Sequence, residues 1–185
     1  MGKVIRDAYV EELHKKIVKK YKLKMHLDGA RCLNAAAFLK VEPADMCRRF
    51  DTISVCLSKG LGCPIGSLVV GSKADIEHAL ILRKLLGGNL RQAGILAQAA
   101  VENLKTWRPK LEEDHKKALY MAEKLQALEC LEVETENIET NMFRFRFRKG
   151  FKAFKHDSFT HKLRDDFGIL MNFGHKNEAI RVVTH

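Results

Sequence analysis

Asp28 is a charged residue at a point where an open α/β sheet would place a ligand-binding group. It closes the stretch LKMHLD, which the pattern of apolar residues predicts to be a short strand. Ligands of open α/β sheets bind outside the carboxyl ends of the strands. Arg31 follows three positions later, at the edge of a predicted helix. Residue types alone favour an ion pair between Asp28 and Arg31 that caps this helix, and they leave a ligand-binding role open.

Lys59 directly follows a second predicted strand, inside the glycine-rich segment CLSKGLGCPIG. Glycines allow the backbone of such a loop to approach a ligand closely. A lysine at a buried strand end is a plausible Schiff-base nucleophile. A lone lysine in a glycine-rich loop more often faces solvent, so Lys59 by itself does not decide between the two interpretations.

Asp28 and Lys59 are more informative as a pair. Pyridoxal phosphate enzymes need a lysine for the cofactor aldehyde and an acid partner for the pyridinium nitrogen. Here a strand-end aspartate is followed by a strand-end lysine 31 residues later. This order and separation are expected for neighbouring strands of one sheet, and they predict that both side chains face one cofactor.

The elements that would position these residues follow from hydrophobic periodicity. Helices are expected at residues 10–20, 30–39, 73–85, 92–106, 111–128 and 158–167, and strands at 23–28, 51–58, 66–72, 131–134, 142–148, 169–172 and 180–183. Strands alternating with helices indicate a parallel α/β layer, and the later mixture indicates a smaller α+β unit. We therefore expect a partial cofactor-binding large domain at 1–110 and a small α+β domain at 111–185.

Composition restricts the function classes only loosely. The 185 residues carry a formal net charge of +10, which favours acidic ligands without choosing among them. Five cysteines without a C-x-x-C spacing argue against a disulfide framework or a zinc site, and they indicate a reducing compartment. No segment approaches the roughly 18 apolar residues of a membrane span. A cytoplasmic protein is expected, with an organelle matrix as the other possibility.

Five segments resemble the threonine aldolases, low-specificity enzymes of the β-eliminating lyase group. They are HLDGAR, SVCLSKGLGCPIGSLVVGSK, RKLLGGNLRQAGILAQAA, ETNMFRF and IRVVTH. The resemblance implies the α/β large domain of a fold-type I pyridoxal phosphate enzyme, followed by a smaller α+β domain. It also implies a retro-aldol cleavage of L-threonine or allo-threonine to glycine and acetaldehyde, in a homodimer or homotetramer with shared sites.

The same resemblance assigns roles to individual residues. Lys59 would bind the cofactor as a Schiff base, and Asp28 would bond its pyridine nitrogen. Arg31 and Arg181 would hold the substrate carboxylate, for which the guanidinium fork is suited. The cofactor phosphate would lie near Ser58, Lys84 and Arg91. No metal, nucleic acid or membrane is expected as a partner.

The sequence also departs from the family pattern. The resemblance covers the carboxyl-terminal portion of the family, without its glycine-rich phosphate-binding turn and its ring-stacking histidine. Asn89 and Leu90 stand where the family usually has glycine and methionine. Two alternatives to an aldolase therefore stay open: a catalytically inactive fragment or paralogue that dimerises, and a basic RNA-binding module.

The RNA-binding alternative depends on the segment FRFRFR at residues 143–148. A strand would place its three phenylalanines on one face and its three arginines on the other. RNA-binding sheets turn aromatic side chains outward for stacking, whereas an ordinary domain buries them. We expect burial, because the adjoining helices need an apolar sheet face to cover.

Overall fold

The computed structural model describes residues 2–148, 156–171 and 179–185. Its contacts divide into two units: Val4–Glu113, and Asp114–His185 together with the first residues up to Lys3. Each unit contains a three-stranded sheet. The expected assignment of one part to cofactor binding stays a prediction. Among the residues described, every helix is too short or too polar to cross a lipid bilayer.

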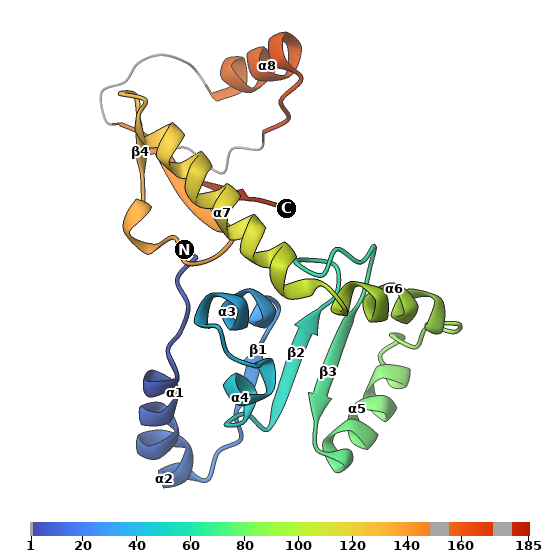
Figure 1. Ribbon diagram of the computed structural model, residues 1–185. Coiled ribbons are helices and arrows are strands. Elements are labelled where there is room, and N and C mark those ends of the chain that lie inside the picture. The colour runs from blue at the N-terminus through green and yellow to red at the C-terminus, as the bar shows by residue number, and fades with distance from the viewer. Residues whose placement is uncertain (1, 149–155, 172–178) are drawn as a thin grey trace. The chain divides into compact units, whose positions relative to one another are not determined.

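The first unit has helices around the sheet β1-β2-β3 (Figure 1). Its strands are β1 (His26–Asp28), β2 (Thr52–Cys56) and β3 (Ser67–Gly71). Its helices are α1 (Asp7–Leu13), α2 (Lys19–Tyr21), α3 (Cys32–Leu39), α4 (Pro43–Cys47), α5 (Lys73–Leu85) and α6 (Gly94–Leu104), with a π-helical turn (His14–Val18) between α1 and α2. The predicted elements of this unit are thus present, with bounds shifted by a few residues.

The sheet of the first unit is mixed rather than fully parallel. β1 pairs parallel with β2, as expected, with Asp28 opposite Ser54. β2 pairs antiparallel with β3, with Cys56 opposite Ser67, so the expected parallel direction of β3 is wrong. The reason is the connection 57–66, which contains no helix. A parallel crossover needs about a dozen or more residues, usually including a helix, whereas a short loop returns the chain antiparallel.

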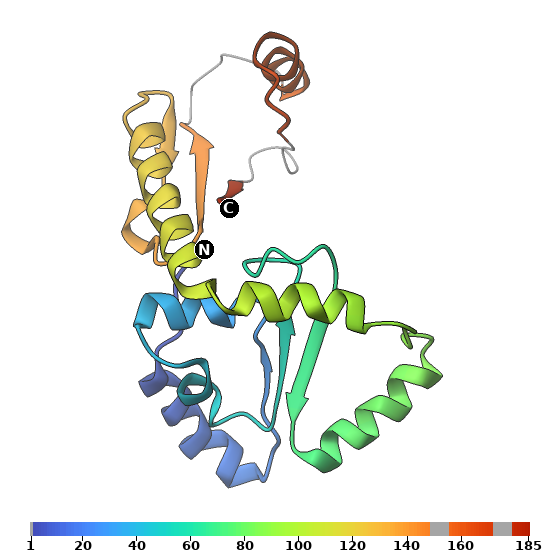
Figure 2. The same ribbon diagram turned by 45° about the vertical axis from the view of Figure 1, so that its right-hand side comes forward.

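The second unit contains the antiparallel sheet β4-β5-β6. Its elements are α7 (Trp107–Gln126), which begins in the first unit, β4 (Leu131–Val133), a 3₁₀ turn (Thr135–Asn137), β5 (Met142–Phe147), α8 (His156–Phe167) and β6 (Ile180–Val183). Figure 2 shows α7 lying along β4 and β5. Phe143 and Phe145 are buried in one cluster with Ala118 and Ala122 of α7. The expected burial of these phenylalanines is confirmed, and it removes them from any stacking surface.

Two further expectations for the second unit differ from the structure. The helix expected at 111–128 begins earlier, at Trp107, and Pro109 lies in its first turn, where a proline needs no helical hydrogen-bond partner. The expected strand at 169–172 is wrong for residues 169–171, and residue 172 lies outside the described residues. Gly168 has a φ of 66° and ends α8, and Ile169 donates its backbone N–H to the carbonyl of Leu163. This helix cap uses the N–H that a strand would need.

Candidate functional site

Asp28 and Lys59 lie at the same edge of the first unit's sheet. Asp28 is the last residue of β1, and Lys59 follows the last residue of β2 by three positions. Because β1 and β2 are parallel neighbours, their carboxyl ends meet at one edge. The structure thus places Asp28 at the end of β1 and Lys59 just after the end of β2, and these two strands lie side by side in the sheet (Figure 1).

Asp28 does not form the ion pair with Arg31 that residue types favoured. Its Oδ1 accepts a hydrogen bond from the backbone N–H of Ala30 at 3.2 Å. The Nε of Arg31 is buried and has no hydrogen-bond partner among the described residues. A buried donor without a partner costs about 1–3 kcal/mol. Arg31 is therefore a side chain with bonding capacity left for a ligand.

Lys59 is held in a loop with three internal backbone hydrogen bonds. The N–H of Gly62 donates to the carbonyl of Lys59 at 2.8 Å, and the N–H of Leu57 donates to the carbonyl of Gly66 at 2.9 Å. The N–H of Cys63 donates to the carbonyl of Leu57 at 3.1 Å. Gly62 and Gly66 have φ values of 68° and 117°, which other residues rarely adopt.

The same loop is fastened to the helices of the first unit by apolar packing. Leu57, Leu61 and Cys63 are buried in a cluster with Ala100 of α6, and Leu33 and Trp107 pack against it. Lys59 is half-buried, and no ion pair involves its amine in the part of the chain that the structure describes. The backbone around Lys59 is therefore held in place by the hydrogen bonds and packing of the loop.

Asn34 was not anticipated from the sequence. It lies on α3 and is buried, and its Oδ1 would be 3.0 Å from a Cβ added at Gly60. Asn34 thus packs against the residue that follows Lys59. A polar residue inside the apolar helix CLNAAAFL was the signal that could have identified it.

The remaining predicted site residues are exposed. Ser58 precedes Lys59, and Lys84 lies near the end of α5. The Gly87 N–H donates to the carbonyl of Lys84, and the Gly88 N–H to that of Arg83, in a Schellman cap. Arg91 follows this cap. No hydrogen bond or ion pair among the described residues joins Ser58, Lys84 or Arg91 to the side chains of Asp28 and Lys59. Arg181 lies on β6 of the second unit.

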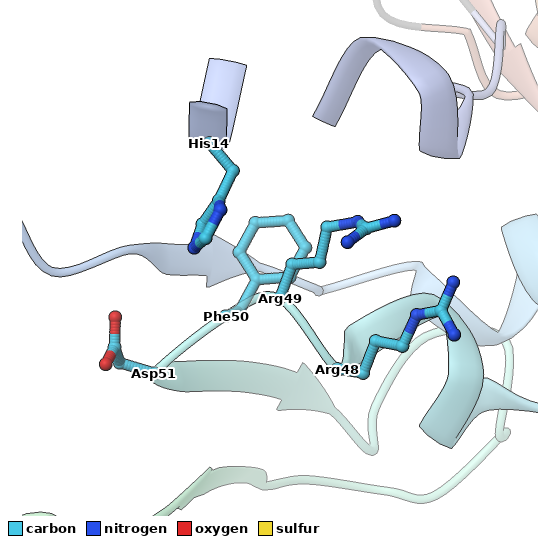
Figure 3. A pocket seen from close by; sticks show the side chains of 5 residues that line it. All are labelled: His14, Arg48, Arg49, Phe50 and Asp51. Carbon is cyan, nitrogen blue, oxygen red and sulfur yellow. The ribbon is translucent and has the colours of Figure 1, made fainter. Parts of the chain in front are cut away.

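A polar hollow of about 570 Å³ lies at the opposite edge of the first unit's sheet, before the amino end of β2 (Figure 3). It is lined by His14, Arg48, Arg49, Phe50 and Asp51. Arg49 donates hydrogen bonds to Asp7 at 3.2 and 3.3 Å, and this contact lowers the pKa of Asp7. Asp51 accepts from Lys24 at 2.8 Å. Arg49 and Asp51, which line this hollow, are therefore already paired with other charged residues of the chain.

An apolar hollow of about 220 Å³ lies against one face of the β1-β2-β3 sheet. Two thiols, Cys32 at the start of α3 and Cys47 at the end of α4, are among its lining groups. A hydrogen bond from Cys32 lowers the pKa of the Cys47 thiol to about 7, whereas the same contact raises the pKa of Cys32. No group of three or more metal-ligating side chains is found within the described ranges.

Comparisons with known proteins identify the family. A model of the beta-eliminating lyase family matches residues 1–147. Low-specificity L-threonine aldolase 1 of Arabidopsis thaliana is 39% identical over 187 residues, which cover 100% of this chain and 50% of that protein. The low-specificity L-threonine aldolase of Escherichia coli K12 is 42% identical over 125 residues, covering 68% of this chain and 37% of the relative. The chain thus spans half the length of the Arabidopsis relative.

Solved structures show the same fold. A Listeria monocytogenes EGD-E protein with the provisional name L-allo-threonine aldolase has a TM-score of 0.77 at 23% identity, covering 95% of this chain and 50% of its own. A pyridoxal phosphate-dependent aminotransferase of Streptococcus suis has a TM-score of 0.70 at 14% identity, covering 100% and 49%. The expected fold class, that of fold-type I pyridoxal phosphate enzymes, is confirmed. From the family model, which matches most of its length, this chain belongs to the beta-eliminating lyase family.

Proposed function

We propose that this chain supplies the lysine and the acid of a pyridoxal phosphate-dependent aldolase site. The reaction is cleavage of the Cα–Cβ bond of threonine or allo-threonine. The substrate hydroxyl loses its proton, acetaldehyde leaves, and a proton added at Cα gives glycine. The observation that carries the proposal is the parallel pairing of β1 and β2, which brings Asp28 and Lys59 to one edge. The names of the relatives support the substrate class.

The residues at this edge fit pyridoxal phosphate. The Asp28 carboxylate accepts one backbone hydrogen bond and keeps capacity for another donor. The buried Nε of Arg31 has no hydrogen-bond partner among the described residues and can donate to a ligand. The amine of Lys59 forms no ion pair among the same residues. When bound, pyridoxal phosphate supplies an aldehyde that reacts with amines and a ring that accepts the electrons of the broken bond.

Each proposed site residue has one role in this reaction. Asp28 holds the proton on the pyridine nitrogen, because an opposite charge favours the protonated form. Lys59 would hold the cofactor through its aldehyde group. Arg31 and Arg181 bind the substrate carboxylate, and Ser58, Lys84 and Arg91 bind the phosphate.

The relatives are longer than this chain, so part of the proposed site is expected to come from outside it. The chain spans half of the Arabidopsis protein, so further cofactor-binding groups are expected from the rest of such a protein or from a second subunit. We propose a homodimer or homotetramer in which sites are shared. An inactive paralogue that keeps only the interface is the second candidate, and the exposed apolar residues of β3 and α5 favour it.

The test is a covalent adduct at Lys59. The purified chain is incubated with pyridoxal phosphate and reduced with borohydride, and the modified peptide is mapped by mass spectrometry. We expect the adduct on Lys59 and its loss in Lys59→Ala, while the control Lys105→Ala, which removes an exposed lysine paired with Glu102, keeps it. An adduct spread over many lysines, or none on Lys59 in a chain with a folded circular-dichroism spectrum, contradicts a live site.

A second measurement separates the role of Asp28 from that of Lys59. In Asp28→Asn the adduct should persist, whereas glycine release from allo-threonine should fall by roughly tenfold or more. Loss of the opposite charge lowers the pKa of the pyridine nitrogen by about 1 to 3. Each unit reduces the ratio of protonated to unprotonated nitrogen about tenfold. The control Asp45→Asn, at an exposed site on α4, should leave glycine release unchanged. Equal rates in Asp28→Asn and the unmodified chain contradict the assignment of Asp28.

A further inference from the structure

The face of the β4-β5-β6 sheet that carries charged side chains contains two arginines directly opposite each other. In the register of β5 and β6, Arg144 is paired with Arg181. Directly opposed residues of antiparallel strands project from the same face, with Cβ atoms about 4.5–5.5 Å apart. The two guanidinium groups therefore emerge from one face at neighbouring positions.

The register that holds this arrangement is set by the opposite face. Phe143 and Phe145 alternate with the arginines of β5 and are buried in the cluster with α7. A shift of β5 by one residue would expose these phenylalanines and bury the arginines. The apolar core thus keeps Arg144 and Arg181 opposite each other whether or not they attract.

The neighbouring arginine on the same face has an internal partner. Arg146 is opposite Glu132 of β4 and donates two hydrogen bonds to its carboxylate, at 2.5 and 3.0 Å. This contact raises the pKa of Arg146, with a smaller contribution from the charge of Glu134. Arg146 is thus neutralised by the fold itself.

Arg144 and Arg181 have no such partner among the described residues. The Nε of Arg144 is buried without a hydrogen bond, and Arg181 is exposed and makes no ion pair. Glu134 donates its backbone N–H to the carbonyl of Arg144, and no ion pair links their side chains. Like charges directly opposite on a sheet destabilise it, and so does a buried donor without a partner. An oxyanion between the guanidinium groups would remove both costs.

We propose that Arg144 and Arg181 form a two-arginine site for a small oxyanion, and that this oxyanion is the substrate carboxylate. The anion site is inferred from the register of β5 and β6 and from the buried Nε of Arg144, which has no hydrogen-bond partner in the described part of the chain. Its assignment to the substrate rests on the proposed function. Arg144 thereby becomes a substrate-binding residue beside Arg181, with each guanidinium group donating to the carboxylate oxygens.

The experiment uses the full chain without cofactor. Arginine Nε–H resonances are followed by nuclear magnetic resonance while acetate is added, and in a parallel titration inorganic phosphate. The Arg144 resonance is expected to shift with acetate. Arg144→Gln and Arg181→Gln should each weaken acetate binding at least about tenfold, since a hydrogen bond to a charged group contributes roughly 1.5–3 kcal/mol.

The control variant is Arg146→Gln, which removes an arginine from the same strand and face but one already paired with Glu132. It should change acetate affinity less than about twofold. An equal loss in all three variants, with their folded spectra retained, means a response to net charge and overturns the site. An unchanged affinity in Arg144→Gln overturns the role of Arg144.

Two outcomes concern the identity of the anion. Tighter binding of phosphate than of acetate overturns the carboxylate assignment. Because no cofactor is present in these titrations, they are independent of the adduct at Lys59. Loss of that adduct together with intact acetate binding contradicts the proposed function and leaves the anion site.

Discussion

At the scale of single residues, the first unit places side chains with unusual bonding states beside the proposed site. Arg31 has a buried Nε without a partner, and the next residue, Cys32, donates its thiol to Cys47. The Cys32 thiol keeps its proton because it is buried and lies beside a group that becomes an anion. Cys47 is consequently the thiol of this pair that ionises near neutral pH.

The alkylation rate of Cys47 tests this pairing. Its pKa is lowered from 9.0 to about 7, so its thiolate fraction rises as pH increases through 7 and falls below it. We expect iodoacetamide to label Cys47 with a rate that reaches half its maximum near pH 7. The measurement is peptide mass spectrometry across a pH series.

A matched variant isolates the cause. Cys32→Ala removes the thiol that donates to Cys47, so the midpoint for Cys47 labelling should move toward the ordinary thiol range. The control Cys130→Ala removes a thiol in the second unit and should leave the midpoint in place. An unchanged midpoint in Cys32→Ala contradicts the hydrogen bond between the two thiols.

At the scale of elements, the site depends on how closely β1 and β2 meet at their carboxyl ends. Gly29 directly follows Asp28, and a Cβ added there would lie 2.7 Å from the backbone oxygen of Ser54 and 3.0 Å from a methyl carbon of Ile53. A backbone oxygen in a paired strand has little freedom to move. Gly29 therefore allows the close approach that sets Asp28 beside β2.

Substitution of Gly29 measures the value of this approach. We expect Gly29→Ala to lower the free energy of unfolding by about 1–3 kcal/mol, because the added carbon overpacks a fixed contact. The measurement is urea denaturation followed by circular dichroism. Glycine release from allo-threonine should fall in the same variant, since Asp28 is displaced.

Gly94 supplies the control for this substitution. It begins α6, and a Cβ added there meets no heavy atom within 4 Å. Alanine is favoured over glycine in helices by up to about 1 kcal/mol, so Gly94→Ala should keep or raise the stability. A Gly29→Ala chain as stable as the Gly94→Ala chain would show that the strands can separate at no cost.

At the scale of the whole molecule, the first unit leaves apolar surface without a partner in the described residues. Leu68, Val69 and Val70 of β3 are 48%, 53% and 49% exposed, and β3 pairs with β2 alone. Leu85 and Leu86 at the end of α5 are 76% and 83% exposed. An exposed strand with apolar side chains favours pairing with another chain.

Self-association is therefore expected and can be measured by sedimentation velocity. Val69→Lys places a charge on β3 and should weaken association roughly tenfold, since burying a valine contributes about 1.5 kcal/mol or more. Tyr9→Lys is the control, because Tyr9 is an exposed residue of α1. A chain that stays monomeric at all concentrations contradicts this use of β3.

The sequence by itself determined the placement of Asp28 and Lys59 at neighbouring strand ends, most of the order of helices and strands, and the burial of Phe143 and Phe145. These conclusions depend on local periodicity and on residue types at strand ends, which a single sequence displays. The family resemblance followed from motifs of the same kind, and the family model confirmed it. The roles given to the site residues stay predictions; these residues are Asp28, Arg31, Ser58, Lys59, Lys84, Arg91 and Arg181.

Only the tertiary structure decided which of these side chains have partners. The direction of β3 follows from a connection too short for a crossover, and Asn34 lies against Gly60 through the packing of α3 on the loop. Arg144 faces Arg181 while Arg146 faces Glu132, although Arg144 and Arg146 have the same neighbouring residues in the sequence. Pairing joins residues far apart in the chain, so whether a charge is neutralised depends on strand register, which the sequence pattern does not specify between strands.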